Sequence, residues 1–298
     1  MEKFNMRPAG FRPLARYLLI AALLLLSACS SLRLAYNHGD TLLYWWLDAY
    51  VDLDSDQKSW VKSDIDNLFQ WHRKTQLHDY VQILQNAQRQ LQGNPTQADL
   101  QADYADIKSR TELLLFKALP ELADLARSLK PDQIEQMQKK FASNNDEFRK
   151  KNMKGDRDQQ QQYRYKKSME QFELWFGSFS SEQEAIIRKA SDARPLDNAI
   201  WLAERQQRQK DVLDLVQKVQ REKLSKDATM TQIHTLIRDG FERMDHSDHQ
   251  AFTDSYNDGT MQLILTVIKI ATPEQKAHAQ KRMQGWIDDF NSLAAQPG

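Results

Sequence analysis

The chain has a single cysteine among 298 residues, few glycines and no excess of either charge. With one cysteine, no intramolecular disulfide can form. The 41 basic and 41 acidic residues leave no positive excess to condense on phosphate, so nucleic-acid binding lacks its main driving force. Nine glycines and eight singly placed prolines leave long uninterrupted stretches, which favour long helices joined by short breaks.

The first 28 residues have the composition of a secretory signal peptide. Four basic residues within the first sixteen precede an uncharged apolar run over residues 17–26. As a helix this run would be about 15 Å long, half of a hydrocarbon core of about 30 Å. We therefore expect the run to be removed rather than to remain as a membrane-spanning helix.

The run ends in the sequence LSAC (26–29), which resembles the bacterial lipobox. That resemblance implies cleavage before Cys29, lipidation of its sulfur and a membrane anchor of three acyl chains, which is effectively permanent. Ser30 in the second mature position implies the periplasmic face of the outer membrane. Loss of the leader leaves 37 basic against 40 acidic residues, a formal charge of about −3. The alternative is that Cys29 is an ordinary buried thiol behind an uncleaved leader.

The rest of the chain follows helical periodicity, which predicts an all-α fold, a bundle of about eight to ten long antiparallel helices. No stretch alternates with the period of a strand. Residues 29–39 would be a short lipid-anchored tether and 40–298 the helical periplasmic domain, which could divide into two halves near 150–160. The predicted helices cover residues 40–50, 54–92, 97–128, 131–152, 158–177, 181–193, 196–225, 229–244, 248–270 and 273–294. Pro120 is expected to kink or break the helix within 97–128.

Four short stretches share one pattern, namely LDSDQ (53–57), LKPDQ (129–133), FSSEQ (179–183) and ATPEQ (271–275). Serine or threonine can cap a helix, proline suits its first position, an acid faces its positive end, and the glutamine can bond back to the cap. The unequal spacings exclude a regular solenoid and favour divergent helix-pair units. The key helix-start residues are Leu53, Gln57, Leu129, Gln133, Phe179, Gln183, Thr272 and Gln275.

These pentapeptides resemble the LTxxQ motif of the periplasmic Spy and CpxP proteins, which are helical chaperones and stress regulators. The segments CSSLRLAYNHGDTLLYWWLDAYVDLDSDQ (29–57) and FELWFGSFSSEQ (172–183) are similar to those of an uncharacterised family of helical proteobacterial lipoproteins. The first resemblance implies contacts with unfolded polypeptides. The second implies a lipid-anchored helical fold and supplies no activity.

Aromatic residues close to the anchor are the first candidates for a partner-binding surface. Trp45, Trp46 and Tyr50, together with Trp175 further along, could rest at a lipid interface or hold exposed segments of other proteins. The alternative is that they are core residues of their helices. Neighbouring residues on a helix are about 100° apart, so at least one of Trp45 and Trp46 must point away from the inward stripe.

The sequence contains no motif typical of a catalytic or cofactor site. DHSDH (245–249) lacks a third zinc ligand, and DSYNDG (254–259) departs from a calcium loop at Tyr256 and Leu265. We therefore predict no metal, no cofactor and no enzymatic activity. The leading interpretation is a lipid-anchored envelope protein that binds proteins or unfolded polypeptides. The alternatives are a periplasmic small-ligand sensor or adaptor and an uncharacterised hydrolase.

Overall fold

A computed structural model describes residues 32–242 and 248–296, and within these ranges the protein is helical throughout, with no strands. This confirms the all-α prediction. None of the helices in these ranges is long and apolar enough to cross a membrane. The helices are α2 (Gly39–Val51), α3 (Ser55–Thr75), α4 (Leu77–Gln92), α5 (Gln97–Lys117), α6 (Leu119–Ser128), α7 (Pro131–Asn152), α8 (Arg157–Phe176), α9 (Ser181–Ala193), α10 (Asn198–Glu222), α11 (Lys226–Glu242), α12 (Gln250–Ile270) and α13 (Pro273–Ala294).

The predicted count of eight to ten helices was too low, because the expected helices 54–92 and 97–128 are each broken in two and residues 32–37, expected as part of a tether, are helical. The break in 97–128 agrees with the kink or helix break expected at Pro120. The segment 97–128 breaks at Ala118, and Pro120 lies in the first turn of α6. A proline there removes a backbone donor and clashes with the preceding turn, so the longer helix cannot continue. The segment 54–92 breaks at Gln76, where both Gln76 and Leu77 are buried. No proline or glycine marks this second break.

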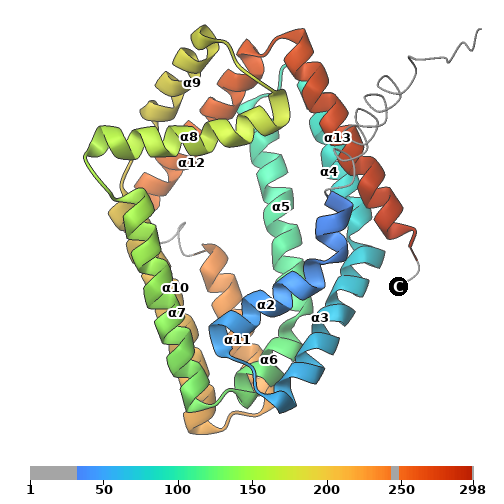
Figure 1. Cartoon of the computed structure of the whole chain (residues 1–298), viewed down its shortest axis with the longest axis vertical. Coiled ribbons are helices and arrows are strands. Elements are labelled where there is room, and N and C mark those ends of the chain that lie inside the picture. The colour runs from blue at the N-terminus through green and yellow to red at the C-terminus, as the bar shows by residue number, and fades with distance from the viewer. Residues whose placement is uncertain (1–31, 243–247, 297–298) are drawn as a thin grey trace, which may run out of the picture.

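The twelve helices form two sets of six, α2–α7 and α8–α13, joined by the short connection at 153–156. Several pairs of packed helices have counterparts that also pack together when each helix of α2–α7 is replaced by the corresponding helix of α8–α13, which indicates a pseudo-twofold relation. The packed pairs α4–α13 and α7–α10 form two columns on opposite sides of the molecule (Figure 1), and the pseudo-twofold relation superposes each column on the other. The corresponding pairs are α2–α7 with α8–α13, α3–α6 with α9–α12, α4–α5 with α10–α11, α4–α13 with α10–α7, and α6–α11 with α12–α5.

The sequence retains a trace of the same relation in α7 and α13. Both helices have 22 residues and begin with proline. Displacing the sequence by 142 residues superposes Gln138 on Gln280, Lys139 on Lys281 and Phe148 on Phe290. The sequence and the packing therefore both indicate an internal duplication.

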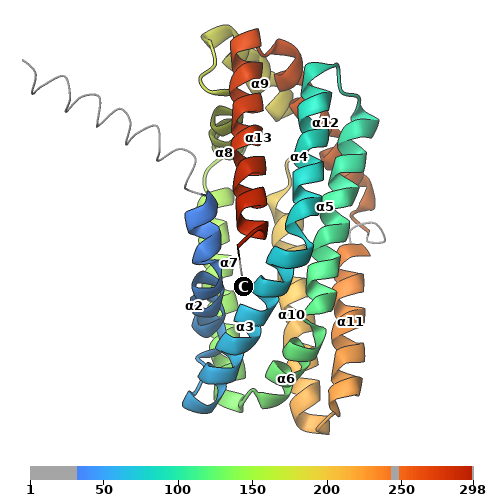
Figure 2. The same ribbon diagram turned by 90° about the vertical axis from the view of Figure 1, so that its right-hand side faces the viewer.

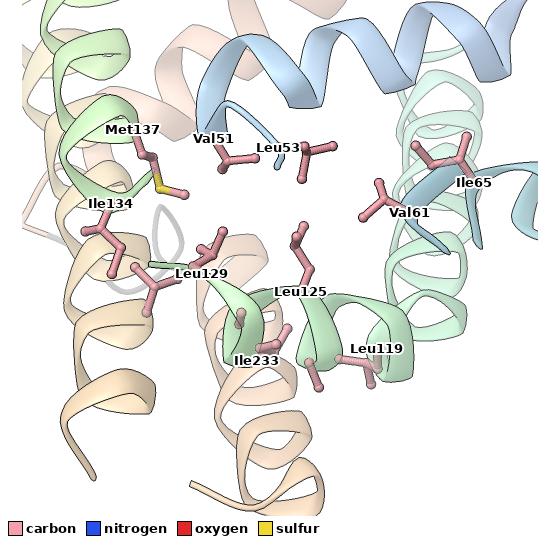
Figure 3. Packing of buried hydrophobic residues seen from close by; sticks show 13 residues of the cluster. Val51, Leu53, Val61, Ile65, Leu119, Leu125, Leu129, Ile134, Met137 and Ile233 are labelled. Carbon is pink, nitrogen blue, oxygen red and sulfur yellow. The ribbon is translucent and has the colours of Figure 1, made fainter. Parts of the chain in front are cut away.

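Two hydrophobic cores lie toward opposite ends of the molecule. In the larger core, side chains from α3, α6, α7 and α11 converge on Val51 and Leu53 at the end of α2 (Figure 3). The smaller core gathers buried residues of α8, α9 and α12 around Ile187 and Val267. The larger core includes Val216 and Ile233 from the second set of helices, so the two halves interlock.

The chain between the lipidation motif and α2 is packed against the helical body. Residues 32–37 are helical, Arg33 Nε lies 2.8 Å from a carboxylate oxygen of Asp289, and the Tyr36 hydroxyl lies 2.8 Å from Nδ1 of His72. The Tyr36 ring also meets Phe69 edge to face. The described part of the expected tether 29–39 is therefore packed helix. Cys29 and the predicted signal peptide 1–28 lie outside the described residues.

Candidate functional site: glutamine clasps and aromatic surfaces

The first and second pentapeptides meet at the larger core and join through their glutamines. Gln57 begins α3 and Gln133 begins α7, and each side chain is only 3% exposed. Gln57 Nε2 donates to Gln133 Oε1 over 3.1 Å, and Gln133 Nε2 donates to Gln57 Oε1 over 2.7 Å. Each amide also donates to the carbonyl just before the partner pentapeptide, that of Ser128 or Asp52. We call this arrangement a glutamine clasp.

The third and fourth pentapeptides form a second clasp with the same geometry. Gln183 Nε2 donates to Gln275 Oε1 over 2.9 Å, and Gln275 Nε2 donates to Gln183 Oε1 over 3.1 Å. The additional acceptors are the carbonyls of Ile270 and Ser178, which again precede the partner pentapeptides. The two clasps therefore occupy equivalent places in the two six-helix sets.

Each clasp uses the full hydrogen-bonding capacity of its two amides. Every glutamine oxygen accepts one bond from its partner and one from the backbone N–H of its own capping residue, Asp54, Lys130, Ser180 or Thr272. Because each NH₂ group has two donors and each oxygen two acceptor positions, no polar capacity remains for an outside molecule. The clasps thus fix how helix pairs cross, and they offer no binding groups.

An ion pair spans the first clasp on its outer side. Lys130 Nζ lies 2.7 Å from a carboxylate oxygen of Asp54. The hydrogen bond from Lys130 and the backbone N–H of Gln57 hold the pKa of Asp54 below its ordinary value. Asp54 therefore acts as a helix cap and ion-pair partner.

The aromatic residues near the lipidation motif divide between core and surface. The Tyr50 ring packs against Phe141, and its hydroxyl accepts a 2.7 Å hydrogen bond from Asn144, which places Tyr50 in the body of the fold. Trp45 and Trp46 are 62% and 57% exposed. The Trp46 ring contacts Tyr50 at a centroid distance of 4.7 Å. We define the α2 surface as the exposed side chains of Leu34, Leu42, Trp45 and Trp46.

Trp175 lies in a different part of the molecule, beside an apolar cavity. Its ring meets Trp286 edge to face at a centroid distance of 4.8 Å, and the Arg282 guanidinium lies within about 6 Å of both rings. The cavity has a volume of about 170 Å³ and is enclosed by α4, α5, α8, α12 and α13. Its lining includes Leu91, Leu100, Phe172, Trp175, Ile264 and Met283.

A second hollow, of about 310 Å³, lies where α7, α8, α10 and α12 meet. Its lining combines the rings of Trp201 and Tyr256 with the cationic side chains of Arg164 and Lys167, and no carboxylate is among the described lining residues. The Arg164 guanidinium donates to the carbonyls of Ser191, Arg194 and Pro195 at the end of α9. Burial lowers the pKa of Arg164.

The segments DHSDH (245–249) and DSYNDG (254–259), which only partly resemble metal-binding motifs, bring together no set of metal ligands in the part of the chain that the structure describes. No group of three or more His, Cys, Asp or Glu side chains there could hold a metal ion. Asp245 and His246 of the DHSDH segment lie outside the described residues. Tyr256, which interrupts the calcium-like segment, meets Trp201 edge to face at a centroid distance of 5.0 Å and lies under the Arg194 guanidinium.

Sequence reasoning missed Trp286 and Arg282 as partners of Trp175. Their spacing of four residues places both on one face of α13, which is the signal that could have found them. Their meeting with Trp175 depends on the packing of α13 against α8. No local pattern contains that information.

The duplicated helical frame, the two internal clasps and the exposed aromatic residues describe an all-helical protein over the residues 32–242 and 248–296. Residues 49–239 match a family of unknown function, DUF6279, and the chain belongs to that family. This confirms the expected membership of an uncharacterised family. No curated protein and no solved structure matches the chain.

Proposed function

We propose that the protein is a lipid-anchored, non-enzymatic component of the bacterial envelope that binds proteins or peptides on the periplasmic face of the outer membrane. The observation that carries this proposal is the apolar cavity beside Trp175. The lipobox-like sequence ending in Cys29 supports the location. A role in chaperoning or envelope maintenance agrees with both features.

The cavity has the size and lining to accept one apolar side chain of a polypeptide. An engineered cavity of about 150 Å³ lined by similar residues binds benzene, and 170 Å³ is close to that volume. The rings of Trp175 and Trp286, with Arg282 above them, form a rigid aromatic wall next to it. Such anchors in partly enclosed pockets carry much of the energy of protein–protein binding.

Filling the cavity tests this assignment. Leu100→Phe adds bulk to the cavity lining, and Leu113→Phe makes the same change at an exposed position of the same helix. We expect the wild-type protein and the Leu113 variant to slow aggregation of an unfolded client, and the Leu100 variant to lose that effect. The proposal is overturned if the wild-type protein neither slows aggregation nor captures an envelope partner.

The hollow of about 310 Å³ favours a second candidate function, that of a small-ligand sensor or adaptor. Aromatic rings together with two cationic side chains suit a small anionic ligand with an apolar body. A thermal-shift screen of aryl and alkyl carboxylates would show one saturable ligand. That ligand should lose affinity on Lys167→Gln and keep it on Lys166→Gln.

A further inference from the structure

We infer that the α2 surface rests on the lipid bilayer and sets the orientation of the whole molecule relative to the membrane. This inference rests on the lipid anchor of the proposed function. Leu42, Trp45 and Trp46 have the spacing of residues on one helix face, and Leu34 lies two turns earlier. This helical segment contains four of the nine large apolar side chains that are exposed among the described residues.

The inner face of α2 is already covered by the protein. Leu43, Leu47 and Tyr50 pack against the larger core, and α2 contacts α3 and α7. A helix that is apolar on both faces is normally covered on both. Within the described chain no helix packs over the Leu42 and Trp45 side, so the covering material must come from outside this part of the protein.

The internal duplication supplies a comparison for these side chains. Displacing the pentapeptide 53–57 by 126 residues superposes it on 179–183, and the same displacement places Ser168 at the position of Leu42 and Gln171 at that of Trp45. The fold therefore accepts polar residues at these positions. Trp46 corresponds to Phe172, which is half-buried and lines the apolar cavity, so it is at the positions of Leu42 and Trp45 that apolar residues occur only in the half with the lipobox-like sequence.

The position of Cys29 favours a bilayer over a protein partner. Cys29 precedes residue 32 by three residues, at most about 11 Å of chain. Arg33 and Tyr36 fix the next turn against α13 and α3 through their contacts with Asp289 and His72. Leu34 and Trp46 are twelve residues apart, at most about 18 Å along the two helical segments that meet at His38. An acyl anchor at Cys29 would therefore hold this surface near the membrane.

The rim of the α2 surface also suits an interface with phospholipid headgroups. An open hollow of about 430 Å³ between α2 and α3 is lined by Tyr44, Trp45 and the exposed Lys58 and Lys62, with Asp40 and Asp66 also present. Tryptophan and tyrosine favour the headgroup region, and lysine can reach lipid phosphates. Figure 2 places α5 on the side of the molecule opposite α2, away from the proposed membrane contact.

The test uses the lipidated protein from its native membrane, reconstituted in vesicles of phosphatidylethanolamine and phosphatidylglycerol with brominated acyl chains. We expect the bromines to quench tryptophan emission of the wild-type protein and Trp45→Gln to lower that quenching about twofold. Leu42→Ser should lower it as well. The matched control is Ile107→Ser on α5, where the side chain is 49% exposed compared with 52% for Leu42, and this variant should leave quenching unchanged.

The mass of the amino-terminal peptide separates the two proposals. An acylated Cys29 without quenching of the wild-type protein overturns membrane docking and leaves the anchor in place. A thiol at Cys29 behind an intact leader overturns the proposed location. Protection of Trp45 from a soluble quencher only after envelope proteins are added would also overturn docking, in favour of a protein partner.

Discussion

The clasp between Gln57 and Gln133 makes a quantitative prediction about stability. Gln133→Leu keeps a side chain of similar size and removes every polar contact that this residue makes. The carbonyl of Asp52 and the backbone N–H of Lys130 then lose their partners. The Gln57 side chain loses both of its hydrogen bonds with Gln133, the one that it donates and the one that it accepts. Because the clasp is buried, water cannot replace most of these contacts.

The expected loss follows from the number of groups left without partners. A buried polar group without a hydrogen bond costs about 1–3 kcal/mol, and the leucine returns part of this through apolar burial. We therefore expect Gln133→Leu to lower the free energy of unfolding by about 3–5 kcal/mol. The double variant Gln57→Leu with Gln133→Leu should lose less free energy of unfolding than the sum of the losses in the two single variants. In the double variant the two leucines face each other, so no glutamine amide is left without its partner.

Urea unfolding followed by circular dichroism measures these differences. The control is Gln138→Leu, which makes the same change at an exposed position of α7 and should alter stability by less than about 0.5 kcal/mol. Gln183→Leu should cost less than Gln133→Leu, because Gln183 is only partly buried. The reasoning is refuted if Gln133→Leu behaves like the control, or if the losses of the two single variants add without coupling.

Three further predictions concern other parts of the fold. Burial lowers the pKa of His72, which faces Tyr36, below its ordinary 6.5. The contribution of His72 to stability should therefore be fully present above pH 6.5 and be lost as the pH falls toward the folded-state pKa. Denaturation at several pH values should show a weaker loss of stability for His72→Gln than for the wild-type protein. Leu53→Ala should cost about 2–5 kcal/mol in thermal or urea unfolding, because this side chain is buried in the larger core. Gly155→Ala should destabilise the protein by about 1 kcal/mol, because the φ of Gly155 is +78°. Gly240 lies within α11 with open space around it, so Gly240→Ala should stabilise the protein by about 0.5–1 kcal/mol in the same assay.

Most helix boundaries could be predicted from sequence because they are set by local chemistry. The helix over 131–152 begins at Pro131 as expected, and the helix over 181–193 begins after the capping residue Ser180. The break at Gln76 could not be predicted, because no proline or glycine marks it and tertiary packing decides where the helix ends. The first half, α3, packs mainly against α2 and α6, whereas the second half, α4, packs mainly against α13.

The candidate surfaces were predictable only in part. The adjacency of Trp45 and Trp46 already requires that one of them face away from the inward stripe, but the structure has both exposed. The pairing of the four glutamines could not be predicted, because a helix-capping pattern contains no information about its partner. Gln57 and Gln133 are 76 positions apart and meet only when two sets of helices pack.

The column formed by α4 and α13 has a consequence for the order of folding. Gln88 and Gln280 exchange hydrogen bonds across 192 positions, so α4 meets α3 and α5 early but lacks its main native partner, α13, until nearly the entire chain has emerged. Contacts between such distant segments carry a large loop-closure entropy and slow the search for the native state. If the chain is exported as we propose, α4 would lack α13 for most of translocation, and a product truncated before α13 would leave the face of α4 that packs on α13 uncovered.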